Sequence, residues 1–331
     1  MMEKFRSRLS EVALLTGGAM FSVAGCKSAP VVPTPELEIQ RRQEAVDAER
    51  VAEGAIHAVA AFPGSGTRSG GIARLDVWVP VSFAGTAAGL AIDAEVFGNR
   101  LQFYPVKSSR EAVLGYSALV PVPFDAKAAE QSVAVRLRRM DQESLVLDSR
   151  LRIIAANYPS ETLTVDPRHV KPDPKAIKRI LREKSILGKV YRGSVREKLW
   201  EGPFEHPVSS IPTSEFGIRR VYNGEMQSYH QGKDYRAAVG TPVLASGAGR
   251  VAYAGDLYMT GNTVILDHGL GLFTIYAHMS AISVAEGKLL PRGAMLGLSG
   301  MTGRASGPHL HFGVNLNRFK VDPNDLLRVA R

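Results

Sequence analysis

The sequence has almost no cysteine: Cys26 is the only one among 331 residues. A single cysteine excludes an internal disulfide and any zinc site built from cysteine thiolates. The apolar run Val12–Gly25 is shorter than the about 20 residues that a transmembrane helix needs. The glycine-rich stretch 293–303 is not followed by Gly-Lys-Ser/Thr, so we interpret its glycines as turn residues rather than a phosphate-binding loop.

Positive charge is concentrated in one part of the chain. The sequence has 41 Lys and Arg against 32 Asp and Glu, a net charge of +9. Residues 168–200 hold eleven basic and three acidic side chains, so this segment carries nearly all of the excess. Because the segment is not rich in aromatic residues, and because the chain begins like an exported protein, no nucleic acid is expected as a partner. The length and the 45% apolar content predict two folded domains plus tails.

The N-terminus indicates export and a lipid anchor. Three basic residues precede the run Val12–Gly25, which is typical of a signal peptide. The run ends in Val-Ala-Gly-Cys, which resembles a bacterial lipobox and implies that Cys26 is acylated after residues 1–25, a lipoprotein signal peptide, are removed. Lys27 in place of Asp is the pattern expected for outer-membrane sorting, so we expect an envelope protein that faces the periplasm. The alternative is an ordinary signal peptide with an incidental cysteine.

The next two segments differ in their hydrophobic pattern. Residues 26–61 predict a proline-rich tether with a short helix over Glu36–Val59. Residues 62–165 change to a period of two without helix signals, which favours a small antiparallel β-sandwich domain. The expected strands are Ile72–Val79, Leu90–Phe97, Arg100–Val106, Val113–Val120, Ser132–Arg138 and Leu145–Ile154. This domain has no cluster typical of catalysis, which leaves positioning, occlusion or partner binding as its role.

Residues 166–203 predict a basic helical linker. Asp173 is a suitable N-cap, and Pro174 suits the first helical position. Apolar residues then recur at helical spacing, and we expect them to pack the helix against a domain. These residues are Ile177, Ile180, Leu181 and Leu187. A second interpretation is attraction of the basic side chains to anionic cell-wall polymer or lipid head groups.

Candidate chemistry is concentrated between residues 230 and 311, which hold five of the eight histidines. His230 and Asp234 lie four residues apart, and His309 and His311 would share one face of a strand. With His278 between these motifs, the set offers imidazole and carboxylate ligands that suit zinc (Zn²⁺), although Mn²⁺ and Fe²⁺ fit the same ligand chemistry. The residues alone do not divide the roles within this set. We interpret His268 as structural and assign no role to His57, His169 and His206.

Eight motifs occur in order along the C-terminal part of the chain. They are Phe216-Gly217-Ile218-Arg219, His230-x-Gly232-x-Asp234, Gly240-Thr241-Pro242-Val243, Ala248-Gly249-Arg250-Val251, Gly261-Asn262-x-Val264, Leu266-Asp267-His268-Gly269, Tyr276-Ala277-His278-Met279-Ser280 and Gly307-Pro308-His309-Leu310-His311-Phe312. Their order resembles the lysostaphin/LytM-type zinc metallopeptidases, over about residues 204–327. The resemblance implies that residues 204–331 form a LytM-type antiparallel β-sheet domain, which makes the chain mainly β.

The resemblance also implies roles for the candidate residues. His230, Asp234 and His311 correspond to zinc ligands, and His278 and His309 correspond to catalytic histidines. The implied activity is a metalloendopeptidase that hydrolyses peptide stems or cross-links of peptidoglycan with a zinc-activated water. Because no His-Glu-x-x-His helix is present, His309 is expected to accept the proton of the water, while His278 stabilises the oxyanion or orients the water. The alternatives are a non-catalytic LytM-type regulator that activates a cell-wall amidase, and a lectin-like wall-binding lipoprotein.

Overall fold

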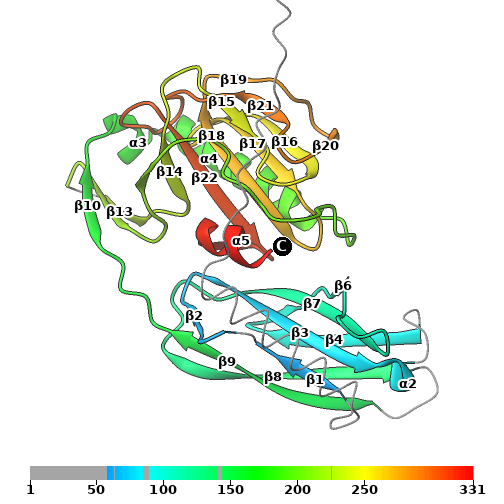
Figure 1. Ribbon diagram of the computed structural model, residues 1–331. Coiled ribbons are helices and arrows are strands. Elements are labelled where there is room, and N and C mark those ends of the chain that lie inside the picture. Colours follow the sequence, from blue (N-terminus) through cyan, green and yellow to red (C-terminus); the bar gives the residue numbers. More distant parts are fainter. Residues whose placement is uncertain (1–57, 63, 85–88, 140–143, 225, 331) are drawn as a thin grey trace, which may run out of the picture. The chain divides into compact units, whose positions relative to one another are not determined.

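The computed structural model describes residues 58–62, 64–84, 89–139, 144–224 and 226–330 (Figure 1). Strands dominate these residues, which confirms the prediction of a mainly β chain. The predicted signal peptide, Cys26 and nearly all of the tether lie outside the described residues, and only the end of the tether is seen, as the strand β1 (Val59–Ala61). Among the described residues, none of the helices combines the length and apolar character needed to span a membrane.

Two sheets form the upstream part of the described chain. The first has the order β1-β3-β7-β6 and the second the order β2-β9-β8-β4-β5. Their remaining members are β2 (Thr67–Arg68), β3 (Ile72–Pro80), β4 (Leu90–Val96), β5 (Asn99–Arg100), β6 (Tyr104–Val106), β7 (Val113–Pro121), β8 (Ala129–Arg139) and β9 (Leu145–Ile154), with the short helix α2 (Val81–Ala84) after β3. Alternate residues of β8 are buried, and they share one hydrophobic cluster with residues of β3.

The prediction of a single strand over Arg100–Val106 is wrong. The segment Arg100–Val106 is divided, because Arg100 ends β5 and Tyr104 begins β6. Strand β5 pairs with β4, whereas β6 pairs with β7. The chain therefore leaves one sheet and joins the other within a few residues, and a continuous period of two does not reveal such a crossing.

The C-terminal part is built on an eight-stranded sheet of order β11-β14-β22-β18-β17-β16-β20, in which β23 also pairs with β22 (Figure 1). These strands are β11 (Pro212–Ser214), β14 (Lys233–Arg236), β16 (Gly249–Leu257), β17 (Gly261–Asp267), β18 (Leu272–Met279), β20 (Leu289–Leu290), β22 (His309–Leu316) and β23 (Phe319–Val321). A smaller sheet contains β15 (Pro242–Leu244), β21 (Met295–Leu298) and β19 (Ala281–Ile282), and the last helix is α5 (Pro323–Val329). The core on one face of the large sheet contains the buried rings of Tyr235, Tyr276 and Phe312.

A third sheet joins segments that lie far apart in the sequence. Strand β10 (Ser160–Leu163) pairs in parallel with β12 (Arg219–Tyr222), which pairs in turn with β13 (Met226–Tyr229). Residues 160–163 fall within the predicted 62–165 segment, yet their hydrogen-bonded partner is the C-terminal part of the chain. The register places Glu161 opposite Arg220.

The basic segment contains α3 (Pro167–Val170) and the longer helix α4 (Pro174–Arg192). The predicted cap is confirmed, because the Asp173 side chain accepts a hydrogen bond from the Ala176 backbone N–H. The expected packing is wrong for Ile177 and Leu181, which are 46% and 61% exposed. Helix α4 instead packs through its C-terminal half, where Leu187 and Tyr191 contact a cluster on β17 and β18. Its N-terminal half is held by polar contacts, so apolar burial is not needed there.

Candidate functional site

The candidate site is positioned by the antiparallel pairing of β14 with β22. In this register Asp234 lies directly opposite His311, so the two side chains project from the same face of the sheet. The Nδ1 atom of His311 is 2.8 Å from Oδ1 of Asp234. His309 lies two residues earlier on β22 and therefore shares that face, with its Nε2 3.8 Å from the same oxygen.

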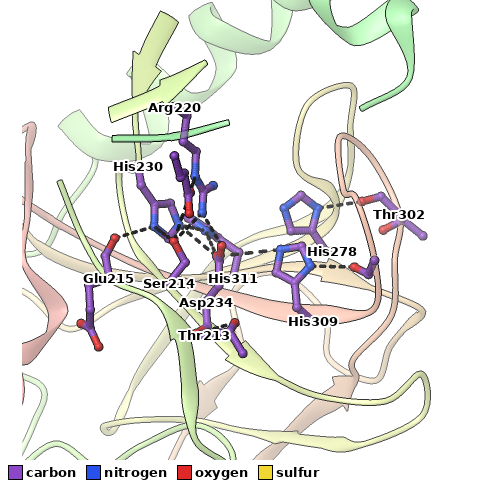
Figure 2. A network of polar contacts seen from close by, with 12 residues as sticks. Thr213, Ser214, Glu215, Arg220, His230, Asp234, His278, Thr302, His309 and His311 are labelled. Carbon is purple, nitrogen blue, oxygen red and sulfur yellow. Dashed lines mark hydrogen bonds and ion pairs between the residues drawn. The ribbon is translucent and has the colours of Figure 1, made fainter. Parts of the chain in front are cut away.

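His230, which lies just before β14, completes a group of three candidate metal ligands (Figure 2). Its Nε2 atom lies 3.0 Å from Asp234 Oδ1 and 3.1 Å from His311 Nδ1. Its Nδ1 donates to the carbonyl oxygen of Glu215 at 2.7 Å, which leaves the Nε2 lone pair directed at the other two ligand atoms. One donor atom from each of the three residues lies within 4.8 Å of the others. Two imidazole nitrogens and one carboxylate oxygen in this arrangement fit a single divalent metal ion.

Gly232 explains the spacing of the His230-x-Gly232-x-Asp234 motif. A Cβ atom at this position would lie 2.6 Å from Cε1 of His311 and 2.6 Å from the carbonyl oxygen of Phe312. Real Cβ atoms do not approach ring and backbone atoms this closely, so only glycine allows the loop to pass beside the third ligand. The motif therefore encodes close packing in addition to two ligands.

His278 reaches the site through a β-bulge. The register of β17 against β18 shifts between the pairs Asn262–Met279 and Val264–Tyr276, and His278 has a φ of +61°. Strict alternation would place His278 on the same face as the buried ring of Tyr276. The bulge turns its side chain toward His309 instead, so that the two ring centroids are 4.7 Å apart.

The tautomers of these two histidines follow from their backbone partners. Nδ1 of His278 lies 2.7 Å from the Thr302 carbonyl oxygen, and Nδ1 of His309 lies 2.8 Å from that of Gly307. Because a carbonyl oxygen only accepts hydrogen bonds, both Nδ1 atoms carry the proton. In the neutral rings, Nε2 is then an unprotonated acceptor. Figure 2 shows both rings beside the group of three candidate metal ligands.

Burial keeps the His278 and His311 rings neutral. Desolvation lowers the pKa of His278 to about 3, and the neighbouring His309 and His311 add to this effect. Desolvation also lowers the pKa of His311 to about 4. Burial alone would raise the pKa of Asp234, but the adjacent ring nitrogens of His230 and His311 hold it well below its ordinary value. His311 is thus a neutral imidazole and Asp234 an ionised carboxylate at neutral pH, and metal binding requires these protonation states of such ligands.

A family model matches the part of the chain that contains this site. The model of peptidase family M23 matches residues 228–323, which contain all five candidate residues. This part of the chain is an M23 peptidase domain.

Named relatives match about a third of the chain. The DD-carboxypeptidase/endopeptidase Mpg of Neisseria meningitidis is 41% identical over 111 residues, 34% of this chain and 26% of the relative. The peptidoglycan DD-endopeptidase ShyA of Vibrio cholerae is 45% identical over 101 residues, 30% of this chain and 24% of the relative. The chain thus spans about a quarter of the length of these curated relatives.

One solved structure matches more of the chain. It is a crystal structure of an M23 peptidase from Pseudomonas aeruginosa, with a TM-score of 0.56 and 28% identity. The match covers 80% of this chain and 96% of that chain. The structural likeness therefore extends beyond the M23 domain into the upstream part.

Two further histidines, His268 and His206, make hydrogen bonds away from the candidate metal ligands. His268 is fully buried, its Nδ1 donating to the Ala248 carbonyl oxygen at 2.7 Å and its Nε2 accepting from the Thr274 hydroxyl at 2.7 Å. These bonds satisfy both ring nitrogens, which agrees with a structural role. His206 bonds the Tyr235 hydroxyl and is not one of the three candidate metal ligands.

Sequence reasoning missed the polar residues that contact the candidate metal ligands. Arg220 donates from Nη2 to Oδ2 of Asp234 at 2.6 Å and from Nε to Oε1 of Glu161 at 2.6 Å. Ser214 lies 3.3 Å from Nδ1 of His230 and accepts from Arg220 at 2.9 Å. Arg220 directly follows a quoted motif, but no local pattern connects Glu161 with a histidine 69 residues later.

A cavity of about 270 Å³ opens beside the candidate site. Asp234, His278 and His309 line one side of it. Leu163 and Val165, which belong to β10 and the residues after it, line it as well. Residues 163 and 165, which precede the M23 domain in the sequence, thus form part of the wall of this cavity.

Proposed function

We propose that this protein is a zinc metalloendopeptidase that hydrolyses peptide bonds in bacterial peptidoglycan, in its peptide stems or cross-links. The observation that carries the proposal is the combination of two neighbouring arrangements: three candidate ligand atoms around one point, and two histidines beside them whose Nε2 atoms are free to accept a proton. The names of the M23 relatives Mpg and ShyA support peptidoglycan as the substrate class.

His230, Asp234 and His311 would hold the metal. When bound, zinc would supply a Lewis acid that polarises the scissile carbonyl and acidifies a water molecule. Zinc is favoured because its preferred donors are imidazole nitrogen and carboxylate oxygen, and three protein ligands leave a position for solvent.

His309 would act as the general base. Its Nδ1–H is fixed by the Gly307 carbonyl, so Nε2 accepts the proton of the attacking water and later delivers it to the leaving amine. His278 has the same tautomer and a strongly lowered pKa, so it is an acceptor at neutral pH. An acceptor orients a water molecule by receiving its hydrogen bond, whereas stabilising an oxyanion needs a donor. Of the two roles expected for His278, orientation of the water therefore fits the structure better.

The proposal includes a location in the cell envelope. Cys26 would carry lipid and hold the protein on the outer membrane, facing the periplasm where peptidoglycan lies. The lipobox-like sequence before Cys26 and Lys27 after it support this placement. Labelling with a radioactive or alkyne fatty acid tests it, because Cys26→Ser is expected to abolish the label and release the protein from the membrane fraction.

Digestion of purified sacculi tests the activity. The wild-type protein is expected to contain about one zinc per chain and to release fragments whose masses identify the bond that is cut. His230→Ala is expected to lose both the metal and the activity, because it removes a ligand. His309→Ala is expected to keep the metal while turnover falls by about 10²–10⁴-fold. A wild-type protein that holds no metal and cuts nothing, yet stimulates a cell-wall amidase, would instead favour a regulatory function.

A further inference from the structure

We propose that Glu161, acting through Arg220, positions the metal ligand Asp234 and thereby sets the metal affinity of the M23 domain. Glu161 lies outside residues 228–323, so a carboxylate from the upstream part of the chain would complete the site. The proposal rests on the metal site of the proposed function. Its test is therefore a binding measurement that is independent of hydrolysis.

The two oxygens of Asp234 have different partners. Oδ1 faces the nitrogens of His230 and His311, at 3.0 Å and 2.8 Å. Oδ2 receives the Nη2 donor of Arg220 at 2.6 Å (Figure 2). Because Arg220 occupies Oδ2, only Oδ1 is available to a metal, and the carboxylate plane is fixed. Arg220 therefore decides both which oxygen binds and how that oxygen is oriented.

Arg220 is itself fixed by Glu161. The Glu161 Oε1 atom accepts from Arg220 Nε at 2.6 Å, and the Ser214 hydroxyl accepts from Nη2 at 2.9 Å. The Arg220 side chain is 12% exposed and that of Asp234 is 8% exposed, whereas Glu161 is 27% exposed. The guanidinium thus lies between two carboxylates with little solvent to replace either one. Removal of Glu161 would leave a largely buried cation with a single anionic partner.

Backbone pairing holds Glu161 next to Arg220. Glu161 and Arg220 are direct partners in the parallel β10–β12 ladder, so their side chains project from the same face. Strand β12 also pairs with β13, which leads directly to His230. The hydrogen-bonded strands therefore hold Glu161 at a set distance from the loop that carries the first ligand.

Charge and geometry predict different effects for different substitutions. Glu161→Ala removes the anchor of Arg220, and we expect zinc affinity to fall about tenfold, the lower end of the range for partners of metal ligands. Glu161→Gln keeps an acceptor oxygen, so we expect an affinity within about threefold of the wild type. Arg220→Lys retains the charge but loses the fork that bonds two carboxylates together, so we expect it to resemble Glu161→Ala.

Equilibrium zinc titration of the full chain tests these expectations. Each metal-free variant competes for zinc with a fluorescent chelator of known affinity, and Co²⁺ absorption spectra report the coordination geometry. The matched controls are Glu130→Ala and Arg150→Ala, because these residues form an exposed ion pair at 3.6 Å in the upstream sheets. Thermal unfolding of the metal-free proteins identifies any variant that does not fold.

The outcomes separate the two proposals. Weaker zinc binding and an altered Co²⁺ spectrum in Glu161→Ala, with restoration in Glu161→Gln and no change in the controls, support the positioning role. Wild-type affinity and an unchanged spectrum in folded Glu161→Ala overturn it and leave the proposed function intact. If Glu161→Ala does not fold, a folded Arg220→Lys that binds zinc like the wild type overturns it equally. A wild-type chain that binds no zinc overturns both proposals.

Discussion

The position of the ring proton determines which nitrogen of a histidine in this protein can accept a proton or bind a metal. His230, His278 and His309 each direct Nδ1 to a backbone carbonyl oxygen, so that Nε2 faces the candidate site. His268 makes the same kind of Nδ1 contact, but its Nε2 is already occupied by a hydroxyl group. Among these four histidines, the partner of Nε2 therefore distinguishes His268 from the three site histidines, whereas His311 faces the site with Nδ1.

The positive φ of His278 makes one substitution a clean test of its role. Asparagine tolerates this backbone conformation far better than alanine, so His278→Asn is expected to fold and to retain metal. Because the imidazole acceptor is lost, we expect hydrolysis of sacculi to fall by at least about 10²-fold. Fragment release and zinc content measure the two effects. If His278→Asn releases fragments at the wild-type rate, His278 does not orient the water.

At the scale of single residues, part of the site could be predicted from spacing. His309 and His311 share a face because a strand has a period of two, and the histidine-glycine-aspartate motif carries two potential ligands on its own. His278 could not be placed by alternation, because a bulge overrides it. Arg220 and Glu161 could not be connected, since their contact depends on the pairing of two strands that are distant in the sequence.

Helix α4 shows how an element can be predicted while its orientation is not. The cap at Asp173 and the helical spacing identified the helix, but spacing alone treats every apolar residue on that side as equivalent. In the structure, apolar residues of the C-terminal half of α4 pack against β17 and β18. The N-terminal half is held by an ion pair from Arg179 and by a backbone hydrogen bond to Glu183. Which turns of the helix are buried depends on the surface beneath them, which the helix sequence does not contain.

This orientation predicts unequal effects of substitutions along α4. Tyr191→Ala removes an edge-to-face contact with Phe273 and a bond from Lys320, and we expect a loss of about 2 kcal/mol in the free energy of unfolding. Leu181→Ala changes an exposed side chain, and we expect a change within about 0.5 kcal/mol. Denaturant unfolding of the two variants measures the difference. A larger loss in Leu181→Ala would show that this face is covered in solution.

The whole molecule is expected to lose stability in acid because it buries neutral histidines. Burial lowers the pKa of His268 to about 4, below the value near 6.5 of an exposed histidine. Between these values the unfolded chain binds a proton that the folded chain does not, so stability falls as pH decreases from about 6.5 toward 4. His278 and His311 act in the same direction. Asp322 opposes them, because burial raises its pKa to about 6 and its protonation favours the folded state.

Comparison with a His268→Gln variant isolates one of these contributions. The metal-free wild-type protein is expected to lose about 2 kcal/mol more than the variant between pH 8 and pH 5, since His268 is fully buried. Chemical denaturation at the two pH values, in the presence of a chelator, measures this difference. Equal losses in the two proteins would mean that His268 is protonated in the folded state.

The close approach of Gly232 to the His311 ring restricts how position 232 can evolve. Any altered amino acid at this position adds at least one carbon atom in the direction of the His311 ring. In the proposed enzyme, one mutation there would disable the site while every histidine and the aspartate stay in place. A homologue could therefore keep all five candidate residues and lose hydrolysis through one substitution. Whether such a homologue is active has to be judged from the residue at position 232 as well.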